Sequence, residues 1–461
     1  VPRPPSLDKP TPSPAWLTRI LRSAGVLGPE TSVAAVEKEG GVLQGGVTNG
    51  VFVCGVKYNP PEGKGERLPA SIVCKASKGS VNLRQGREAL FCDPVSATRR
   101  GLACLSMQNV VPYPGTRMYC SLPEWGSPIG IYIVMENLKP NSIRADQFHG
   151  AQAGTQKLEE GAGANTKLKS EEMWQLAFEY AAETHAQYLG RFPVTLDGKS
   201  FEPSAFGNDK ALVEGIGRLK YADWLLGKNR EGYETSVKNC HRIWDLVEKD
   251  WMDSGLKKFI SSCLQNSSFD EAVKEMRRRP ITLCHGDFHA KNMFYIPKKR
   301  QVATVDFSEV AVGDPISDLT QYIISDIPTS TRRAHEKKIL TAYWTKLTEV
   351  LNSQTGSRGE SKTVSGLGSL TFDDFLQFYK TGIDRWIWFF PFMAFFDGCT
   401  KKSKEGLEAK ENSSWSPPKR TIYFHDAIRD FLKDHCDGIE YLVMRGVCEI
   451  DATAFLGPAK E

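Results

Sequence analysis

The chain has 461 residues, of which 40% are hydrophobic and 25% charged, as in an ordinary globular protein with two or three domain-sized units. Its net charge of +4 is small for this length and its basic residues are dispersed, so the composition gives no indication of nucleic-acid binding. The eleven cysteines form no C-x-x-C pair, which indicates reduced thiols in a cytoplasmic protein rather than a disulfide framework.

Targeting and membrane signals are absent from the given sequence. It contains no recognisable secretory signal, although it begins with Val1 rather than Met, so a targeting segment removed before this residue stays an open alternative. The most apolar run, residues 386–396, contains a proline and is too short to cross a bilayer. We therefore expect no membrane span.

The first predicted elements are a tail, a helix and a group of strands. Residues 1–15 are rich in Pro and Ser and predict an extended tail, with a helix that begins near Ser13 or Trp16. From about Val33 the pattern changes to strands, and two apolar segments flank a glycine-rich turn. The backbone N–H groups of such a hairpin turn can approach phosphates. This turn contains Gly45, Gly46, Thr48, Asn49 and Gly50.

The next predicted strand, residues 71–77, places Lys75 among apolar neighbours. A lysine in this setting is either solvated on the other face of the strand or paired with a carboxylate, because burying its charge alone is costly. A helix predicted over residues 82–100 offers Glu88 as that carboxylate. In the alternative interpretation Lys75 is an ordinary surface residue and Glu88 pairs with Arg84 on its own helix.

The remaining predicted elements are one more strand followed by several helices. Residues 131–138 predict a β-branched strand that ends in Met135, Glu136 and Asn137. Residues 171–189 predict an amphipathic helix, in which we expect His185 to be a packed, hydrogen-bonded core residue rather than a catalyst. Downstream we expect two or three helices over 211–279, a helix pair over 332–351, an aromatic helix over 372–396, a polar loop over 401–419 and a final helix over 421–447.

The aromatic segment allows several interpretations. At helical spacing, aromatic residues such as Trp386 and Trp388 usually form core. The same rings could instead bind a quaternary ammonium group through cation–π contacts, or line an apolar cleft for a bulky alcohol. Asp384 and Asp397 could alternatively meet an amine.

The most informative stretch is LCHGDFHAKNMFY, residues 283–295, followed by VATVDF, residues 302–307. Asp287 and Asn292 are five positions apart, and Asp306 follows fourteen positions later. Phosphoryl transfer needs such a set, because one carboxylate accepts the proton of a substrate hydroxyl while an amide oxygen and a second carboxylate bind magnesium at the ATP phosphates. The apolar runs in both segments predict strands that leave these residues on the same side of one sheet.

Other interpretations of this stretch were weighed. His285 and His289, four positions apart, could form a metal-binding pair on one helix face. Gly286 and the lack of the Glu of an H-E-x-x-H motif argue against a zinc site. An HGD tripeptide alone would be a turn or chance about as often as a functional site, so the interpretation depends on the joint spacing.

The pattern HGDxxxxN followed by a strand ending in DF resembles the aminoglycoside phosphotransferase and choline kinase superfamily. The whole chain looks most like its ecdysteroid-kinase-like, or CHK-kinase-like, branch. This resemblance implies an α+β, two-lobed protein-kinase-like fold, with a small, mainly antiparallel β lobe over residues 16–137 and a mainly helical lobe over 138–461. It also implies an ATP- and Mg²⁺-dependent O-phosphotransferase that acts on a hydroxyl of a small organic molecule, with the active site between the lobes.

The resemblance assigns roles to the residues of the catalytic motif. It implies that Asp287 is the catalytic base, that Asn292 and Asp306 are magnesium ligands and that His285 supports the loop. The segment GDPISDL, residues 313–319, resembles the DPxxDL segment of the same superfamily. The last Asp of that segment holds the catalytic loop, a role that falls here on Asp318.

The resemblance also implies a nucleotide site. The strand lysine and the helix glutamate resemble the pair that positions ATP phosphates in kinases. The glycine-rich turn resembles the GGxTN segment of choline and ethanolamine kinases, and residues 131–138 resemble the edge strand that leads into the adenine-binding hinge. The residues implied to bind the nucleotide are Lys75, Glu88, Gly46, Thr48, Asn49, Glu136 and Leu138.

Three rival functions remain beside this interpretation. A protein kinase is disfavoured because Gly286 replaces the Arg of its catalytic loop, Ser308 or Glu309 replaces the Gly after its DF pair, and no APE segment is present. A catalytically silent, kinase-like binding module is disfavoured because the motif residues are intact. A choline- or ethanolamine-type kinase stays an open alternative for the acceptor.

Overall fold

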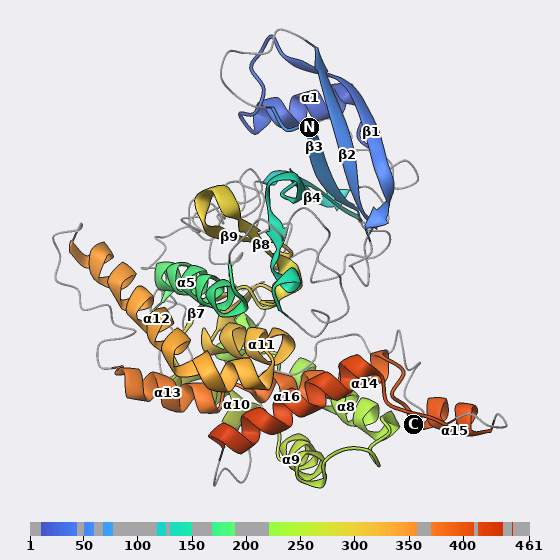
Figure 1. Cartoon of the computed structure of the whole chain (residues 1–461), viewed down its shortest axis with the longest axis vertical. Helices are drawn as coiled ribbons and strands as arrows, with labels where there is room; N and C mark the ends of the chain where they lie inside the picture. Colours follow the sequence, from blue (N-terminus) through green and yellow to red (C-terminus); the bar gives the residue numbers. More distant parts are fainter. Residues whose placement is uncertain are drawn as a thin grey trace. The chain divides into compact units, whose positions relative to one another are not determined.

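The computed structural model, drawn in Figure 1, describes residues 11–43, 50–59, 68–76, 118–125, 130–149, 168–189, 221–356, 370–409, 414–436 and 445. The chain divides into two compact units. Unit 1 consists of Val1–Arg144, Phe206–Leu219 and Asn292–Val310, and unit 2 consists of Ala145–Ala205, Lys220–Lys291 and Ala311–Glu461. The N-terminal part is built on an antiparallel sheet and the C-terminal part is mostly helical, so the predicted α+β class is confirmed.

The first helix, α1, spans Pro14–Ser23 and begins where the sequence predicted. The side chain of Ser13 accepts a hydrogen bond from the Trp16 N–H (3.3 Å), and Pro14 occupies the first helical position, where no backbone donor is needed. Trp16, Leu17 and Leu21 are buried on one face of the helix. This face packs against the sheet of unit 1.

Five antiparallel strands form the sheet of unit 1, in the order β1-β2-β3-β5-β4. They are β1 (Ser32–Leu43), β2 (Gly50–Asn59), β3 (Ser71–Ala76), β4 (Met118–Trp125) and β5 (Gly130–Glu136). The sequence missed β4, which carries a proline and no continuous apolar run. Because β4 pairs with β5, the prediction that β5 is an edge strand is wrong.

Alternation along the strands fixes which side chains of unit 1 enter the core. Phe52 and Cys54 on β2 and Ile72 and Cys74 on β3 belong to the buried cluster that includes α1, which lies beside these strands in Figure 1. Successive side chains of a strand point to opposite faces. Lys75 therefore lies on the face of β3 turned away from α1.

Two small sheets hold the segments of the catalytic motif. In unit 2, β7 (Thr282–Cys284) pairs with β10 (Ala311–Gly313), and in unit 1 a three-stranded sheet has the order β6-β8-β9. The strands of that sheet are β6 (Ile143–Arg144), β8 (Met293–Ile296) and β9 (Gln301–Thr304). The prediction that both motif strands share one sheet is wrong. The apolar residues after Asn292 form β8, and a short turn lets β9 pair with it as a local hairpin.

Unit 2 is mainly helical, and several helix predictions need correction. Four helices lie between residues 221 and 279 instead of two or three, the expected pair over 332–351 is one helix, and the expected loop over 401–419 contains a helix. The helices are α5 (Ser170–Tyr188), α7 (Ala222–Leu225), α8 (Arg230–Leu246), α9 (Ser254–Gln265), α10 (Phe269–Arg278), α11 (Ile316–Asp326), α12 (Thr329–Gly356), α13 (Phe372–Lys380), α14 (Asp384–Phe396), α15 (Lys401–Glu408) and α16 (Lys419–His435).

The aromatic segment is two helices, α13 and α14, because the chain breaks at Gly382. A Cβ atom at this glycine would lie 2.4 Å from the Ile316 Cγ2 atom and 2.8 Å from the Thr320 Cγ2 atom of α11. The Gly382 carbonyl also accepts a hydrogen bond from the Thr320 hydroxyl (2.8 Å). This close approach to α11, which only glycine permits, ends α13 and sets the start of α14.

Both tryptophans of α14 are core residues. Trp386 and Trp388 are each only 2% exposed. Trp386 packs on Phe389 and on Phe424 of α16, with ring centroids 5.3 Å and 5.0 Å away. The core interpretation of the aromatic segment is therefore confirmed at these two positions.

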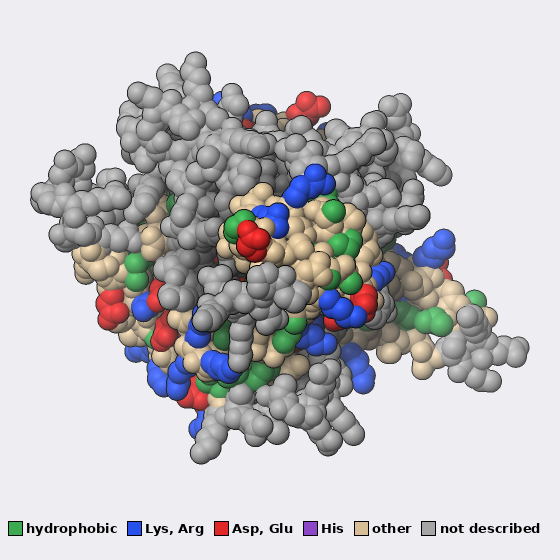
Figure 2. Space-filling view, turned by 90° about the horizontal axis from the view of Figure 1, so that it is seen from above, with side chains coloured by type: hydrophobic (Ala, Val, Ile, Leu, Met, Phe, Trp, Pro, Cys, Tyr) green, Lys and Arg blue, Asp and Glu red, His purple; other side chains and the backbone are tan. Residues whose placement is uncertain are grey.

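Two further features concern membrane-spanning helices and the distribution of surface charge. None of the helices in the described ranges is long and apolar enough to cross a membrane. On the face shown in Figure 2, basic and acidic side chains are interspersed over the described surface.

Replacing Trp386 or Trp388 by Leu should lower the melting temperature by several degrees without changing the KM for the acceptor. Each change leaves a cavity in a packed core, at a cost of about 2–4 kcal/mol. The matched control is Phe396→Leu on the same helix, where the side chain is 44% exposed and the melting temperature should stay nearly constant. Thermal unfolding followed by circular dichroism measures both, and an unchanged melting temperature in the tryptophan variants would contradict the core assignment.

Candidate active site

The buried lysine of unit 1 forms an ion pair with the aspartate of the VDF segment. Lys75 is 7% exposed, and its Nζ atom lies 2.8 Å from the Oδ1 atom of Asp306. Lys75 is thus paired with a carboxylate rather than solvated. This agrees with the interpretation that gave the lysine a carboxylate partner. The partner described here is Asp306, 231 positions away, whereas the proposed partner Glu88 lies outside the described residues.

Asp306 adopts a backbone conformation that is unusual for its residue type. Its φ angle of 64° and ψ angle of 69° lie in the left-handed region, which non-glycine residues seldom occupy. Strained backbone of this kind persists where surrounding contacts impose it, and it occurs often at functional sites. With this backbone conformation the chain leaves β9 at Asp306, and the half-buried carboxylate contacts Lys75.

Asn292 lies next to Asp306 at the same end of the β8–β9 hairpin. The Val305 N–H donates to the Asn292 carbonyl (2.9 Å), and Met293 is opposite Thr304 in the ladder. The sequence prediction that these two residues lie together is consistent with this pairing within unit 1. An amide oxygen and a carboxylate are hard oxygen donors of the kind that magnesium prefers, so the donor set fits this ion.

In unit 2, the backbone that precedes the proposed base is held by a buried aspartate. Asp318 on α11 accepts hydrogen bonds from the N–H groups of His285 (2.7 Å) and Gly286 (2.9 Å). Gly286 has a φ angle of 78°, which favours glycine and accounts for the absence of a larger residue at this position. The predicted contact between Asp318 and the loop is therefore present.

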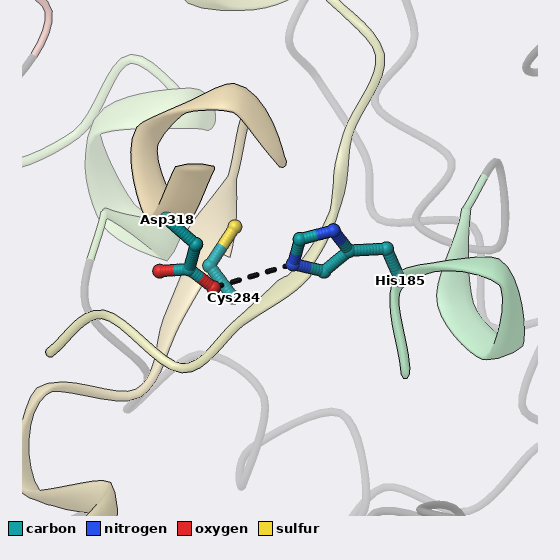
Figure 3. Close-up of side chains that lie close together, drawn as sticks. All are labelled: His185, Cys284 and Asp318. Atoms are coloured by element: carbon teal, nitrogen blue, oxygen red, sulfur yellow. Dashed lines mark hydrogen bonds and ion pairs between the residues drawn. The ribbon is translucent and has the colours of Figure 1, made fainter. Parts of the chain in front are cut away.

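Asp318 is itself held by His185, as Figure 3 shows. His185 Nε2 lies 3.2 Å from an Asp318 carboxylate oxygen, and His185 Nδ1 lies 2.9 Å from the hydroxyl of Tyr343. His185 is 1% exposed, so the prediction of a packed, hydrogen-bonded core histidine is confirmed. Both of its ring nitrogens are engaged.

His185, Cys284 and Asp318 also have the composition of a metal site, with their potential ligand atoms within 4.8 Å of one another. Their contacts argue for support of the loop instead. The Cys284 thiol donates to the Asp314 carbonyl, and burial, together with the charges of Asp318 and Asp314, raises the pKa of this thiol well above its ordinary value. A thiolate ligand is therefore unfavourable here.

Asp287 is oriented by three neighbours in unit 2. Gln321 Nε2 donates to Asp287 Oδ1 (2.9 Å), His289 Nε2 lies 3.4 Å from Asp287 Oδ2, and the Asp287 N–H donates to His285 Nδ1 (3.2 Å). Burial alone would raise the pKa of Asp287, but the charge and hydrogen bond of His289 outweigh it and lower that pKa below the ordinary value. The Asp287 charge in turn outweighs the effect of burial on His289 and raises the pKa of the imidazole.

The C-terminal end of the loop, at Ala290, is held by Asp326, a second buried carboxyl group of α11. Asp326 Oδ2 accepts hydrogen bonds from the Ala290 N–H (2.8 Å) and the Ser325 hydroxyl (2.6 Å). Burial raises the pKa of Asp326 to about 6, although His289 opposes the shift. Gln321 lies between the two carboxyls and accepts from the Phe288 N–H (3.1 Å), so α11 binds the loop at four backbone N–H groups.

Gln321 and Asp326 were not predicted from the sequence, and His289 was considered only as a possible zinc ligand. Gln321 and Asp326 follow Asp318 by three and eight positions, so all three side chains lie on one face of α11. This spacing was a usable signal. A buried apolar helix gives no sign of which polar residues contact a loop, however, until the loop is placed.

The predicted adenine-binding segment is ordered by local hydrogen bonds in unit 1. After β5, Asn137 Nδ2 donates to the Ser71 hydroxyl (2.9 Å), and Asn137 Oδ1 accepts from the Lys139 N–H (3.1 Å). The adjacent Glu136 is half-buried and Leu138 is buried. Their adenine contacts stay a prediction, while the predicted phosphate-binding residues Gly46, Thr48 and Asn49 lie outside the described residues.

The two carboxylates that the sequence offered to an amine are both occupied by arginines. Asp384 binds Arg445 through both oxygens (2.6 Å and 3.0 Å), and Asp397 binds Arg420 (2.9 Å). Asp384 is also buried. The amine-binding interpretation of Asp384 and Asp397 is therefore wrong.

Part of the chain, including this loop and α11, is similar to a kinase-like family. Residues 218–355 match the model of the ecdysteroid kinase-like family. The family resemblance predicted from the motif is confirmed over this segment, which contains Asp287, Asn292, Asp306 and the whole of α11. Lys75 and α14 lie outside the matched segment. No curated protein matches the chain.

Several solved structures are distantly similar to this chain. The GDP complex of aminoglycoside 2'-phosphotransferase-IIIa is 13% identical, with 93% of this chain and 100% of that chain covered and a TM-score of 0.38. The choline kinase of Cryptosporidium parvum Iowa II is 11% identical, with 88% and 90% covered and a TM-score of 0.41. LicA in complex with AMP is 11% identical, with 90% and 97% covered and a TM-score of 0.37.

Replacing Asp326 by Asn should stabilise the protein near neutral pH and leave its stability unchanged in acid. In the unfolded chain Asp326 ionises near 3.8, but in the folded protein its pKa is about 6, so the native protein loses stability as the pH rises between these values. Asparagine imitates the protonated carboxyl and still accepts from Ala290. The gain should be on the order of 2 kcal/mol above about pH 6 and vanish near pH 4.

Thermal unfolding of both proteins across this pH range provides the measurement. Asp270→Asn is the matched control, because its side chain is 72% exposed and the change should have no comparable dependence on pH. A gain of equal size at about pH 4 and pH 7 would show that Asp326 is not protonated in the folded protein.

Proposed function

We propose that the chain is an ATP- and Mg²⁺-dependent O-phosphotransferase that acts on a hydroxyl of a small organic molecule. The observation that carries this proposal is the ion pair between Lys75 and Asp306. It joins a buried strand lysine to an aspartate in a strained, left-handed conformation, in a position that core packing alone does not require. The match of residues 218–355 to a kinase-like family supports the same class of reaction.

On this proposal the polar residues of unit 1 bind the nucleotide. Lys75 would contact the ATP phosphates, and Asn292 and Asp306 would hold the magnesium ion through their oxygen atoms. Magnesium, when bound, would neutralise charge on the phosphate groups. The ion pair with Asp306 would hold the Lys75 ammonium group in a fixed orientation before ATP arrives.

Asp287 of unit 2 would act as the catalytic base. Its lowered pKa keeps it ionised at neutral pH, so it can accept a hydrogen bond from the acceptor hydroxyl and then its proton. Gln321 and His289 each contact one carboxylate oxygen and leave lone pairs for that hydroxyl. The catalytic effect would come mainly from position and charge, as in other phosphoryl transfers.

Asp287→Asn should reduce turnover at least about 100-fold while nucleotide affinity changes little, because the amide keeps the shape but cannot accept the proton. Steady-state transfer from radiolabelled ATP measures the rate, and calorimetric titration measures the affinity. Asp250→Asn is the control, since Asp250 is 81% exposed and has no place in this site. Retention of more than about a tenth of the activity would refute the role of Asp287 as a base.

Asp306→Ala and Asn292→Ala should each weaken the binding of Mg-ATP, because each removes a proposed oxygen ligand of the cation. Titration calorimetry at several magnesium concentrations provides the measurement, and Asn266→Ala, an exposed residue with local hydrogen bonds only, serves as the control. The magnesium assignment is wrong if both variants keep the native affinity and the native magnesium dependence. A catalytically silent binding module would bind Mg-ATP but transfer no phosphoryl group.

A further inference from the structure

Arg385, in the first turn of α14, differs from the other arginines in its surroundings. It is half-buried, and among the described residues no hydrogen bond or ion pair engages its guanidinium group. Its neighbour Asp384 is bound by Arg445. Other buried or half-buried arginines of unit 2 that have carboxylate partners are Arg279, Arg332, Arg420, Arg429 and Arg445.

The packing of α14 on α11 joins the segment just before Arg385 to the helix that contacts Asp287. The Thr320 hydroxyl of α11 donates to the Gly382 carbonyl, three residues before Arg385, and the next residue of α11, Gln321, donates to Asp287. After the larger effects of burial and His289, the charge of Arg385 is a further influence that lowers the pKa of Asp287. The guanidinium group therefore lies within electrostatic range of the proposed base.

A second hydrogen-bond donor without a partner lies on α16, which packs against both α11 and α14. The Tyr423 hydroxyl is buried and has no hydrogen-bond partner among the described residues. Burial and the charge of Asp326 raise the pKa of this hydroxyl, so Tyr423 lies within electrostatic range of Asp326. Arg385 and Tyr423 thus offer hydrogen bonds from two helices that border α11, the helix that holds the loop.

The two carboxylates and the two tryptophans of α14 that the sequence offered to a cation are engaged elsewhere among the described residues. Asp384 and Asp397 are bound by arginines, and the indole rings of Trp386 and Trp388 are buried in the core. The described residues therefore leave the positive charge of Arg385 within electrostatic range of Asp287, and neither of the two cation-binding arrangements that the sequence suggested is available. A charge left without a partner in a half-buried place is unfavourable, so a ligand that supplies an anion would be stabilised there.

We propose that the acceptor alcohol carries an anionic group, such as a carboxylate, sulfate or phosphate, and that the guanidinium group of Arg385 binds it. This inference rests on the proposed function, since it names the acceptor class of the same phosphotransfer site. A planar guanidinium group can bind a carboxylate or phosphate through two parallel hydrogen bonds, which fixes the distance between that group and the reacting hydroxyl. Tyr423 can add a third hydrogen bond.

The test uses three acceptors of equal chain length that differ in charge: a hydroxycarboxylate, its primary amide and the corresponding amino alcohol. The native protein should give the highest kcat/KM with the hydroxycarboxylate. Arg385→Gln should lower the ratio of kcat/KM between the carboxylate and the amide about tenfold or more, mainly through KM, and Arg385→Lys should keep part of it. Arg385→Glu should shift the preference toward the amino alcohol.

Arg429→Gln is the matched control. It removes one guanidinium group from the same unit, but Arg429 is bound to Asp426 and Asp430 on its own helix, so the preference among the three acceptors should not change. Binding of the same three compounds is measured in parallel by saturation-transfer nuclear magnetic resonance. This arm gives an order of affinity even where the chain length prevents turnover.

The outcomes separate this inference from the proposed function. Preference of the native protein for the amino alcohol, or a carboxylate preference that persists in Arg385→Gln, would overturn the inference while the phosphotransfer stands. An equal loss of rate with all three acceptors in Arg385→Gln would also overturn it, because Arg385 would then act on the transferred phosphoryl group. If none of the three acceptors is phosphorylated but carboxylate binding still depends on Arg385, the anion site remains. The proposed function then fails only if the native protein also does not bind Mg-ATP.

Discussion

The loop that contains Asp287 depends on one helix, α11, whose polar residues accept hydrogen bonds from the N–H groups of four loop residues. Asp318, Gln321 and Asp326 make these contacts from a single face, and all three are buried. A loop with buried backbone donors is stable only if each donor finds an acceptor. The helix therefore fixes the loop conformation, and His185 in turn fixes Asp318.

The charged side chains around this loop are mostly arranged in ion pairs. Most carboxylates and guanidinium groups in the described part of unit 2 are paired, for example Asp314 with Arg279 and Arg445. Burying a charge without a partner costs free energy, so the charges that are not fully matched identify places where a ligand can bind. By this criterion Arg385 is a candidate ligand-binding residue, whereas Asp384, which is paired with Arg445, stabilises the fold.

Prediction from the sequence worked best where local chemistry decides the structure. The start of α1 near Ser13 was predictable because a helix cap needs only neighbouring atoms. It failed for β4, whose pattern is weak, and for α13 and α14, which read as one helix. That break is imposed by the contact of Gly382 with α11, which no residue near Gly382 in the sequence reveals.

By itself, the sequence predicted the α+β class through its family resemblance, and the spacing within one short stretch singled out Asp287, Asn292 and Asp306. Only the tertiary structure decided that Lys75 pairs with Asp306, that α11 holds the loop, and that the tryptophans of α14 are core. Each of these facts joins residues distant along the chain. Residue type limits the partners that a side chain can accept, but the packing of the chain selects which partner it meets.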